Sequence, residues 1–154
     1  MRHVIWWSAG AASTIAAKLH LETHPESVLV YCDTRSERPD NERFCCDVER
    51  WLNREIVVLA SDDYHDIWDV WERTRWLVGE GGARCTIELK KRLRQQFEDP
   101  TDIQVFGYHA GEADRVERFK AANPDVNLAV PLIDRGVTKA ECLGALRSAG
   151  IELP

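Results

Sequence analysis

Short runs of hydrophobic residues alternate along this chain with longer stretches in which apolar residues recur every three or four positions. Continuous apolar runs are typical of strands buried on both faces of a sheet, and the longer spacing is typical of amphipathic helices. The expected strands are residues 3–7, 27–32, 56–59, 103–108 and 128–130. This alternation predicts an α/β fold with one domain over residues 1–154, a parallel Rossmann-like sheet of about five strands with helices on both faces.

Helices are expected between these strands. The pattern predicts them at residues 12 to about 23, 40–53, 64–77, 85–97 and 112–122, with a last helix opened by the capping box Thr138-x-x-Glu141. Residues 61–63 offer capping side chains to the third helix. The three tryptophans of that helix are expected in the core, and a flexible break is expected at residues 79–82; the tryptophans are Trp68, Trp71 and Trp76.

The first loop of the predicted sheet carries the clearest candidate chemistry. In open parallel sheets, ligands bind at the carboxyl ends of strands where the strand order reverses, which directs attention to the loops after the first and fourth strands. The first reads Ser8-Ala9-Gly10-Ala11-Ala12-Ser13 and opens a helix. Free backbone N–H groups and the helix dipole favour phosphate there, and small residues permit a close approach. An ordinary structural turn is the alternative.

Charge and cysteine content narrow the classes of function. The net charge of −6 does not support attraction of the whole molecule to nucleic acid or anionic lipid, so a phosphate must be held by local geometry. No apolar run approaches the roughly 18 residues needed to cross a bilayer. Five cysteines without a C-x-x-C pair, and no signal peptide, indicate reduced thiols and a cytoplasmic location.

With its strand and helix, the S-x-G-x-x-S loop resembles the PP-loop of the adenine nucleotide α-hydrolase superfamily, and the chain resembles its PAPS (phosphoadenosine phosphosulfate) reductase family, most closely the short phage-type members. Further segments match in order along nearly the whole chain. They are Asp33-Thr34 with Glu37, Pro39 and Asp40; C-T-I-E-L-K from Cys85 to Lys90; and Phe106-Gly107-Tyr108 with Glu112 and Arg115.

The resemblance implies an enzyme that acts on an adenine nucleotide, PAPS or a related adenylyl-sulfate, near its α-phosphate, with a thiol redox partner. It implies that Ser8, Gly10, Ala11 and Ser13 cradle phosphate. It also implies nucleotide-binding roles for four residues further along the chain, Asp33, Thr34, Lys90 and Gly107. One alternative is an ATP-dependent sulfurtransferase or adenylating enzyme that uses Mg²⁺ and whose acceptor can be a nucleic acid. The other is a non-catalytic nucleotide-binding module. The oligomeric state stays open.

Two residues are candidates for catalysis. Cys85 begins a predicted helix with Arg84, Lys90 and Lys91 close in sequence, an environment that stabilises a nucleophilic thiolate; a buried core cysteine is the alternative. Arg115 follows the fourth strand, and its guanidinium matches phosphate or sulfate in a bidentate fork. A surface pair with Glu112 is the alternative for Arg115.

The sequence departs from the family pattern in the phosphate loop and at the nucleophile, and its metal-binding patterns are weak. Ala9 and Ala12 replace the usual Gly and Asp of the loop, and the Glu-Cys-Gly-Leu segment that carries the family's nucleophile is not found, so Cys85 or a partner's thiol would attack sulfur. An iron–sulfur cluster on Cys85 with Cys45 or Cys46 is a disfavoured alternative. His20 and His24 have a metal-binding spacing, but no third ligand is evident, and no metal site is expected.

Overall fold

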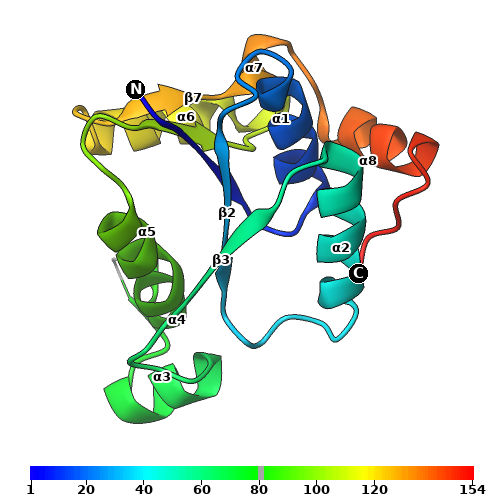
Figure 1. Cartoon of the computed structure of the whole chain (residues 1–154). Coiled ribbons are helices and arrows are strands. Elements are labelled where there is room, and N and C mark those ends of the chain that lie inside the picture. The colour runs from blue at the N-terminus through cyan, green and yellow to red at the C-terminus, as the bar shows by residue number, and fades with distance from the viewer. Residues whose placement is uncertain (80–81) are drawn as a thin grey trace.

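The central element of the fold is a five-stranded parallel sheet, seen in a computed structural model that describes residues 1–79 and 82–154 (Figure 1). The strand order is β3-β2-β1-β6-β7, and every neighbouring pair is parallel. The α/β architecture predicted from the hydrophobic pattern is therefore confirmed. The strands are β1 (His3–Trp7), β2 (Val28–Asp33), β3 (Ile56–Ala60), β6 (Ile103–Phe106) and β7 (Asn127–Ala129).

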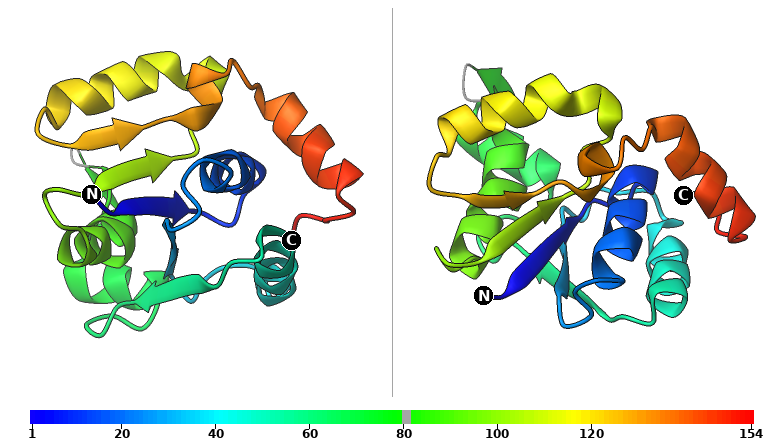
Figure 2. Two further views of the ribbon diagram at one scale, coloured as in Figure 1. Left: turned by 45° about the horizontal axis from the view of Figure 1, so that its top comes forward. Right: turned by 90° about the horizontal axis from the view of Figure 1, so that it is seen from above.

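Helices cover both faces of this sheet (Figure 2). They are α1 (Ala11–Leu21), α2 (Asn41–Leu52), α3 (Ile67–Thr74), α4 (Arg84–Thr86), α5 (Arg92–Phe97), α6 (Ala113–Ala122), α7 (Pro131–Asp134) and α8 (Lys139–Ser148), with a π-helical turn η1 (Ile87–Lys91) and a 3₁₀ turn η2 (Ala110–Glu112). Alternate residues of β1 face opposite ways, as the period of two requires. Ile5 and Trp7 belong to the larger core with α1, α2 and α8, and Val4 and Trp6 belong to a smaller core with Phe97 of α5.

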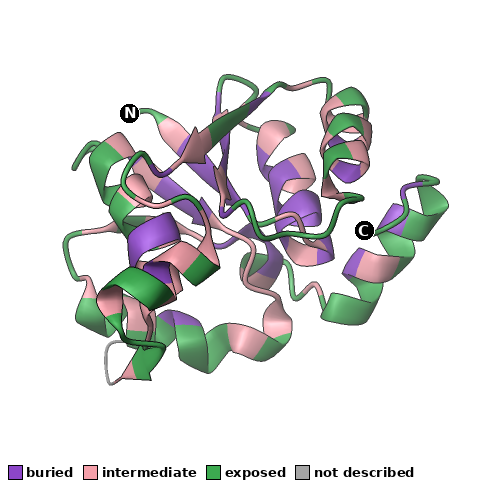
Figure 3. Cartoon of the chain, turned by 90° about the horizontal axis from the view of Figure 1, so that it is seen from below, coloured by how far each residue is buried: buried purple, intermediate pink, exposed green. Residues whose placement is uncertain are grey.

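The most deeply buried residues lie on the inner strands and on the helix faces turned toward them (Figure 3). Phe44 of α2 is fully buried, and its ring stacks on the Trp7 indole with 5.6 Å between centroids. The capping box that opens α8 forms as expected: the Glu141 N–H donates to the Thr138 hydroxyl. None of the described helices is long and apolar enough to span a bilayer.

The segment between β3 and β6 departs most from the sequence-based prediction. The helix expected at residues 64–77 is limited to Ile67–Thr74, and a short antiparallel hairpin of β4 (Val78–Gly79) and β5 (Gly82–Ala83) follows. Residues 80 and 81 of the expected flexible break lie outside the described residues. The helix expected over residues 85–97 is divided by the π-helical turn η1.

The expectation that Trp68, Trp71 and Trp76 are core residues is wrong for two of them. Trp68 is 68% exposed and Trp76 is 46% exposed, while Trp71 is partly buried and meets Trp68 edge-to-face. Val70 is the one buried residue of α3, because the helix lies beyond the sheet and packs mainly against α4. Because Val70 is the one buried residue among the eight of α3, the larger aromatic side chains of this segment are exposed or only partly buried.

An ion pair joins the starts of β1 and β6. The Arg2 guanidinium donates to both carboxylate oxygens of Asp102, with 2.9 Å from Nε to Oδ1, and the Asp99 N–H donates to the same carboxylate at 2.8 Å. Asp102 is almost fully buried. The hydrogen bond from Arg2 is the main cause that lowers the pKa of Asp102 below its ordinary value.

Asp102→Asn is expected to lower the free energy of unfolding by about 1–2 kcal/mol at neutral pH, because a charge-assisted pair is lost. The folded-state pKa of Asp102 lies below the unfolded value, so this contribution is present above about pH 4 and disappears as pH falls through the folded pKa. Urea denaturation of both proteins from pH 7 to pH 3 measures it. A stability gap that stays constant over this range would contradict the assignment.

Candidate functional site

The carboxyl ends of β1 and β6 meet where the strand order reverses. This is the point at which the sequence pattern predicted a ligand site. The two strands are paired in register up to Trp6 and Phe106, so their following loops are neighbours. Gly107 packs directly against the first turn of α1: a Cβ on this residue would lie 2.5 Å from Ser13 Cα and 2.7 Å from Ser13 N. Only glycine fits this approach, which fixes the start of α1 against the end of β6.

The first turn of α1 presents unpaired backbone donors. Gly10 is the N-cap in an extended conformation (φ −131°, ψ 164°), and the first helical bond runs from Thr14 N to Gly10 O at 3.0 Å. The N–H groups of Ala11, Ala12 and Ser13 precede that bond and have no acceptor four residues back within the helix. Together with the positive end of the helix dipole, they form a site suited to an anion.

The two serines brace the loop from within. The Ser13 hydroxyl accepts from Ser8 N and contacts Ser8 Oγ, both at 3.1 Å, and donates to Gly10 O at 3.1 Å. Ser13 is buried, while Ser8 is exposed at the mouth of the loop. The structure thus brings the predicted loop residues together, and it gives Ser13 a part in shaping the loop.

A buried hydrogen-bond chain ties this loop to the core. The Trp7 indole N–H donates to the Thr14 hydroxyl at 2.7 Å, and that hydroxyl donates to Gly10 O at 2.8 Å. Trp7 and Thr14 are almost completely buried. The conformation of Gly10 is therefore set by residues that are themselves fixed by core packing.

Ala9 adopts a left-handed conformation with φ of 54°, which disfavours any residue that has a Cβ. Ala9→Gly removes this strain but adds flexibility to the unfolded chain, so a net gain of about 0.5 kcal/mol in unfolding free energy is expected. Ala12→Gly is the matched control, because Ala12 lies in the first turn of α1, where glycine costs about 0.5–1 kcal/mol. Equal effects at the two positions in thermal denaturation would contradict this prediction.

The end of β2 gathers a second group of the predicted residues. The Thr34 hydroxyl donates to Glu37 Oε1 at 3.1 Å, and Lys90 Nζ lies 3.7 Å from the same oxygen. The π-helical turn that carries Lys90 packs on β2. Asp33 accepts the N–H of Arg35 at 2.8 Å. Asp33, Thr34 and Lys90 are therefore close together, one strand away from the Ser8–Ser13 loop.

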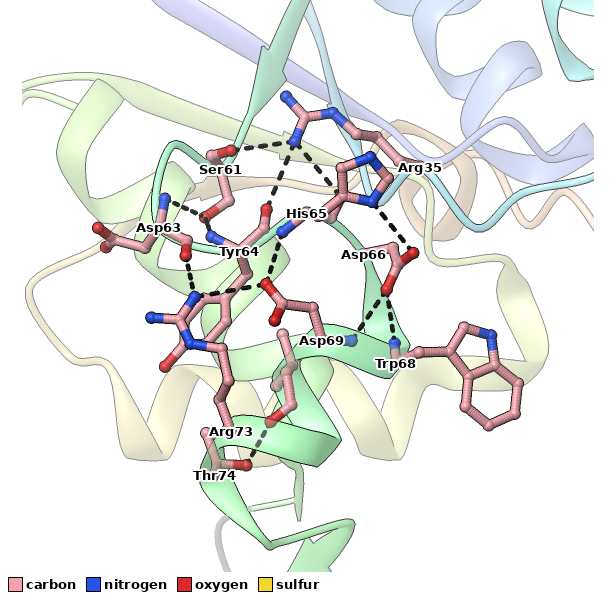
Figure 4. Close-up of polar contacts among 11 residues, drawn as sticks. Arg35, Ser61, Asp63, Tyr64, His65, Asp66, Trp68, Asp69, Arg73 and Thr74 are labelled. Carbon is pink, nitrogen blue, oxygen red and sulfur yellow. Dashed lines mark hydrogen bonds and ion pairs between the residues drawn. The ribbon is translucent and has the colours of Figure 1, made fainter.

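Arg35 organises the loop after β3, a role that the sequence pattern did not predict (Figure 4). One nitrogen of its guanidinium, Nη1, donates to the backbone carbonyls of Ser61, Tyr64 and His65 at 3.2–3.4 Å. The contacts join residues that are 26–30 positions apart in the sequence, so no local pattern predicts them. Arg35 thus joins the loops that follow β2 and β3 along the carboxyl edge.

Two of the three cations expected to activate Cys85 are engaged by carboxylates. Arg84 Nη2 lies 2.7 Å from the buried carboxylate of Glu88, and Lys90 pairs with Glu37. Cys85 itself is partly buried in α4, which packs against α3. The other main contact of α4 is with η1, the turn that carries Lys90.

Arg115 pairs with Glu112 at 2.8 Å, the surface contact that the i, i+3 spacing offered as the alternative to ligand binding. Its guanidinium also lies over the Tyr108 ring, 5.1 Å from the centroid. These two contacts hold the side chain near the loop after β6, although it is 62% exposed. A ligand that needed Arg115 would have to compete with Glu112.

The thiols are not brought together, but three histidines are. All five cysteines are free, and burial raises the pKa of Cys32 and raises that of Cys45 to about 11. Among residues 1–79 and 82–154, the one group of three side chains with metal-ligating atoms in mutual reach is His3, His20 and His24. The expectation that His20 and His24 lack a third partner is wrong, because α1 runs back along β1 and its last turn lies beside His3.

Two hollows of the described surface lie away from the carboxyl edge. One lies near the amino ends of β6 and β7, between Ile103, Asn123 and Leu128, and the other lies beside Cys46 and Arg54. Neither contains a predicted site residue, and both lack the converging backbone donors found at the start of α1. The carboxyl edge therefore remains the better candidate on chemical grounds.

No family model matches this chain, and no curated protein matches it in sequence.

Proposed function

We propose that this chain binds an adenine nucleotide at the carboxyl edge of its sheet, with the phosphates on the loop between β1 and α1. The observation that carries the proposal is the contact of Gly107 with the backbone of Ser13. It holds the unpaired N–H groups of α1 at the point where the strand order reverses, and a phosphate at this point gains both hydrogen bonds and a favourable dipole.

The adenosine would extend from this loop toward the end of β2. Trp7 and Tyr31 are register partners, so Ser8, just after β1, and Asp33, the last residue of β2, lie at the carboxyl ends of neighbouring strands. Asp33 and Thr34 offer polar groups to the nucleoside, and Lys90 offers a cation to a further phosphate. Lys90 is partly exposed and only 3.7 Å from Glu37, an arrangement that a competing phosphate can displace.

The reaction proposed for this site is that of a PAPS reductase-like enzyme, supported by the four segments that resemble that family. A thiolate attacks the sulfur of an adenylyl-sulfate, and the sulfur–oxygen bond to the nucleotide phosphate breaks. The N–H groups of the loop and Arg115 stabilise the charge on the departing phosphate. Cys85 or a thiol of a redox partner is the nucleophile.

A non-catalytic nucleotide-binding module is the second candidate. It is favoured by the ion pairs that occupy Arg84, Lys90 and Arg115, because these pairs leave Cys85 and the loop without a free cation from among them. An ATP-dependent sulfurtransferase or adenylating enzyme would use the same loop with Mg²⁺ and cleave between the α and β phosphates. The preferred nucleotide distinguishes this reaction from reduction of PAPS.

The test is calorimetric titration of the reduced protein with PAPS, ATP-Mg²⁺ and AMP, compared with Gly10→Val. A Cβ on Gly10 has only Ser8 Oγ within 4 Å, at 3.8 Å, and the extended backbone accepts any residue, so the variant is expected to fold. The added methyl groups would crowd the mouth of the loop. Losing one or two charge-assisted hydrogen bonds predicts binding about 10- to 100-fold weaker.

Gly144→Val is the matched control, because Gly144 lies in α8 with no neighbouring atom within 4 Å of an added Cβ. It should bind nucleotide as the unmodified protein does. Binding that Gly10→Val leaves unchanged, or no binding of any nucleotide by folded protein, would refute the proposed site. Turnover of PAPS that is lost in Cys85→Ser would favour the enzyme over the binding module.

A further inference from the structure

Three histidine side chains gather at the amino edge of the sheet, at the opposite end of β1 from the phosphate loop. His3 begins β1, His20 lies in the last turn of α1, and His24 follows in the turn that leads to β2. Because α1 runs antiparallel to β1, its last turn returns to the residue that begins the strand. The fold itself therefore brings together residues that are 17 and 21 positions apart.

The rings are close enough to share one ligand. His3 Nδ1 and His20 Nε2 are 2.8 Å apart, and one nitrogen from each of the three rings lies within 4.8 Å of the others. The ring centroids are separated by 4.1 Å for His3 and His24 and by 4.6 Å for His20 and His24. The backbone of the turn is held as well, since His24 N donates to His20 O at 2.9 Å.

The three rings differ in their access to water. His20 is 6% exposed, whereas His3 and His24 are partly buried. A ligand could therefore reach the group from the side of His3 and His24, while packing holds the His20 ring in place.

We propose that His3, His20 and His24 form a binding site for a divalent transition metal ion of the Zn²⁺ type. Three imidazole nitrogens suit zinc and its neighbours rather than Mg²⁺ or Ca²⁺, which prefer oxygen. With Zn–N distances of about 2.0–2.1 Å, tetrahedral ligand nitrogens stand about 3.4 Å apart. Rotation of the rings from separations of up to 4.8 Å reaches this geometry, and the metal replaces the hydrogen bond between His3 and His20.

The ligand set leaves a fourth position for water or a carboxylate. Glu26 follows His24 by two residues, and its charge acts on both His3 and His20. The carboxylate would compensate part of the charge of a bound cation. The metal site is separate from the phosphate loop, so the inference stands whether or not the proposed nucleotide function is correct.

The competing explanation is a packed stack of neutral rings held by one hydrogen bond, and a zinc titration separates the two. The full chain, reduced and carrying no polyhistidine tag, is freed of metal with a chelator and titrated with Zn²⁺ against a chromophoric competitor. His24→Ala is the test variant, because His24 is only partly buried and its loss should leave the fold intact. His65→Ala is the control, since His65 is exposed in the loop after β3.

His24→Ala is expected to bind Zn²⁺ at least about 100-fold more weakly than the unmodified chain, and His65→Ala should bind it equally well. His3→Gln repeats the test from the strand, and circular dichroism verifies that each variant is folded. Co²⁺ should give visible bands of a nitrogen-ligated ion without sulfur-to-cobalt charge transfer. Equal Zn²⁺ affinity in all variants, or a cobalt spectrum of thiolate ligation, would overturn the proposal.

Discussion

Gly107→Ala is expected to lower the free energy of unfolding by about 2–3 kcal/mol and to disturb the start of α1. The added Cβ would lie 2.5 Å from Ser13 Cα, 2.7 Å from Ser13 N and 3.0 Å from the carbonyl carbon of Ala12. These are backbone atoms, so no side chain can turn aside and the helix itself must move. Overpacking of this kind typically costs 1–3 kcal/mol, and a backbone clash belongs at the upper end.

Urea denaturation measures the loss, and Gly144→Ala supplies the control. Gly144 lies inside α8 with open space around it, so alanine there should raise the unfolding free energy by about 0.5–1 kcal/mol. Amide chemical shifts of residues 10–14 should change in Gly107→Ala and not in Gly144→Ala. A stable Gly107→Ala protein with unchanged shifts would mean that the contact between β6 and α1 is looser than described.

The strands and most helices could be predicted because their signals are local. Five apolar runs predicted the five strands of the sheet, with ends that differ by at most two residues from those observed. The start of the third helix was predicted at residue 64 and lies at Ile67 because two sets of capping residues compete within six positions. Ser61 accepts from the N–H groups of Asp63 and Tyr64 and makes a turn, whereas Asp66 accepts from Trp68 and Asp69 at 2.9 Å and begins the helix.

The candidate site divides in the same way between local and distant contacts. The loop from Ser8 to Ser13 is contiguous, so its composition and its place between strand and helix were enough to predict its geometry. The Arg35 contacts with the loop after β3 depend on the pairing of β2 with β3, and the approach of His3 to His20 depends on the return of α1 along β1. No short pattern encodes either contact. For Arg115, both interpretations were available, and the local pair with Glu112 is the one that the structure contains.

Phe44→Ala should cause the largest loss of stability, about 3–5 kcal/mol, which is the range for truncating a buried phenylalanine. The Phe44 side chain has no exposed surface and stacks on the Trp7 ring at an interplanar angle of 24°. A domain of this size is typically stable by only 5–15 kcal/mol, so the variant would keep a fraction of its stability. Phe44→Leu retains most of the volume and should lose about 1–1.5 kcal/mol.

The same substitution should reach the phosphate loop through Trp7. Without the Phe44 ring, the Trp7 indole loses the surface that orients its N–H toward the Thr14 hydroxyl, and that hydroxyl fixes Gly10 O. Hydrogen exchange of the Trp7 indole N–H should therefore accelerate in Phe44→Ala by more than the loss of global stability accounts for. Acceleration equal to that of the β1 amides would mean that the cavity acts only through global unfolding. The packing of Phe44 would then stabilise the fold without separately ordering the phosphate loop.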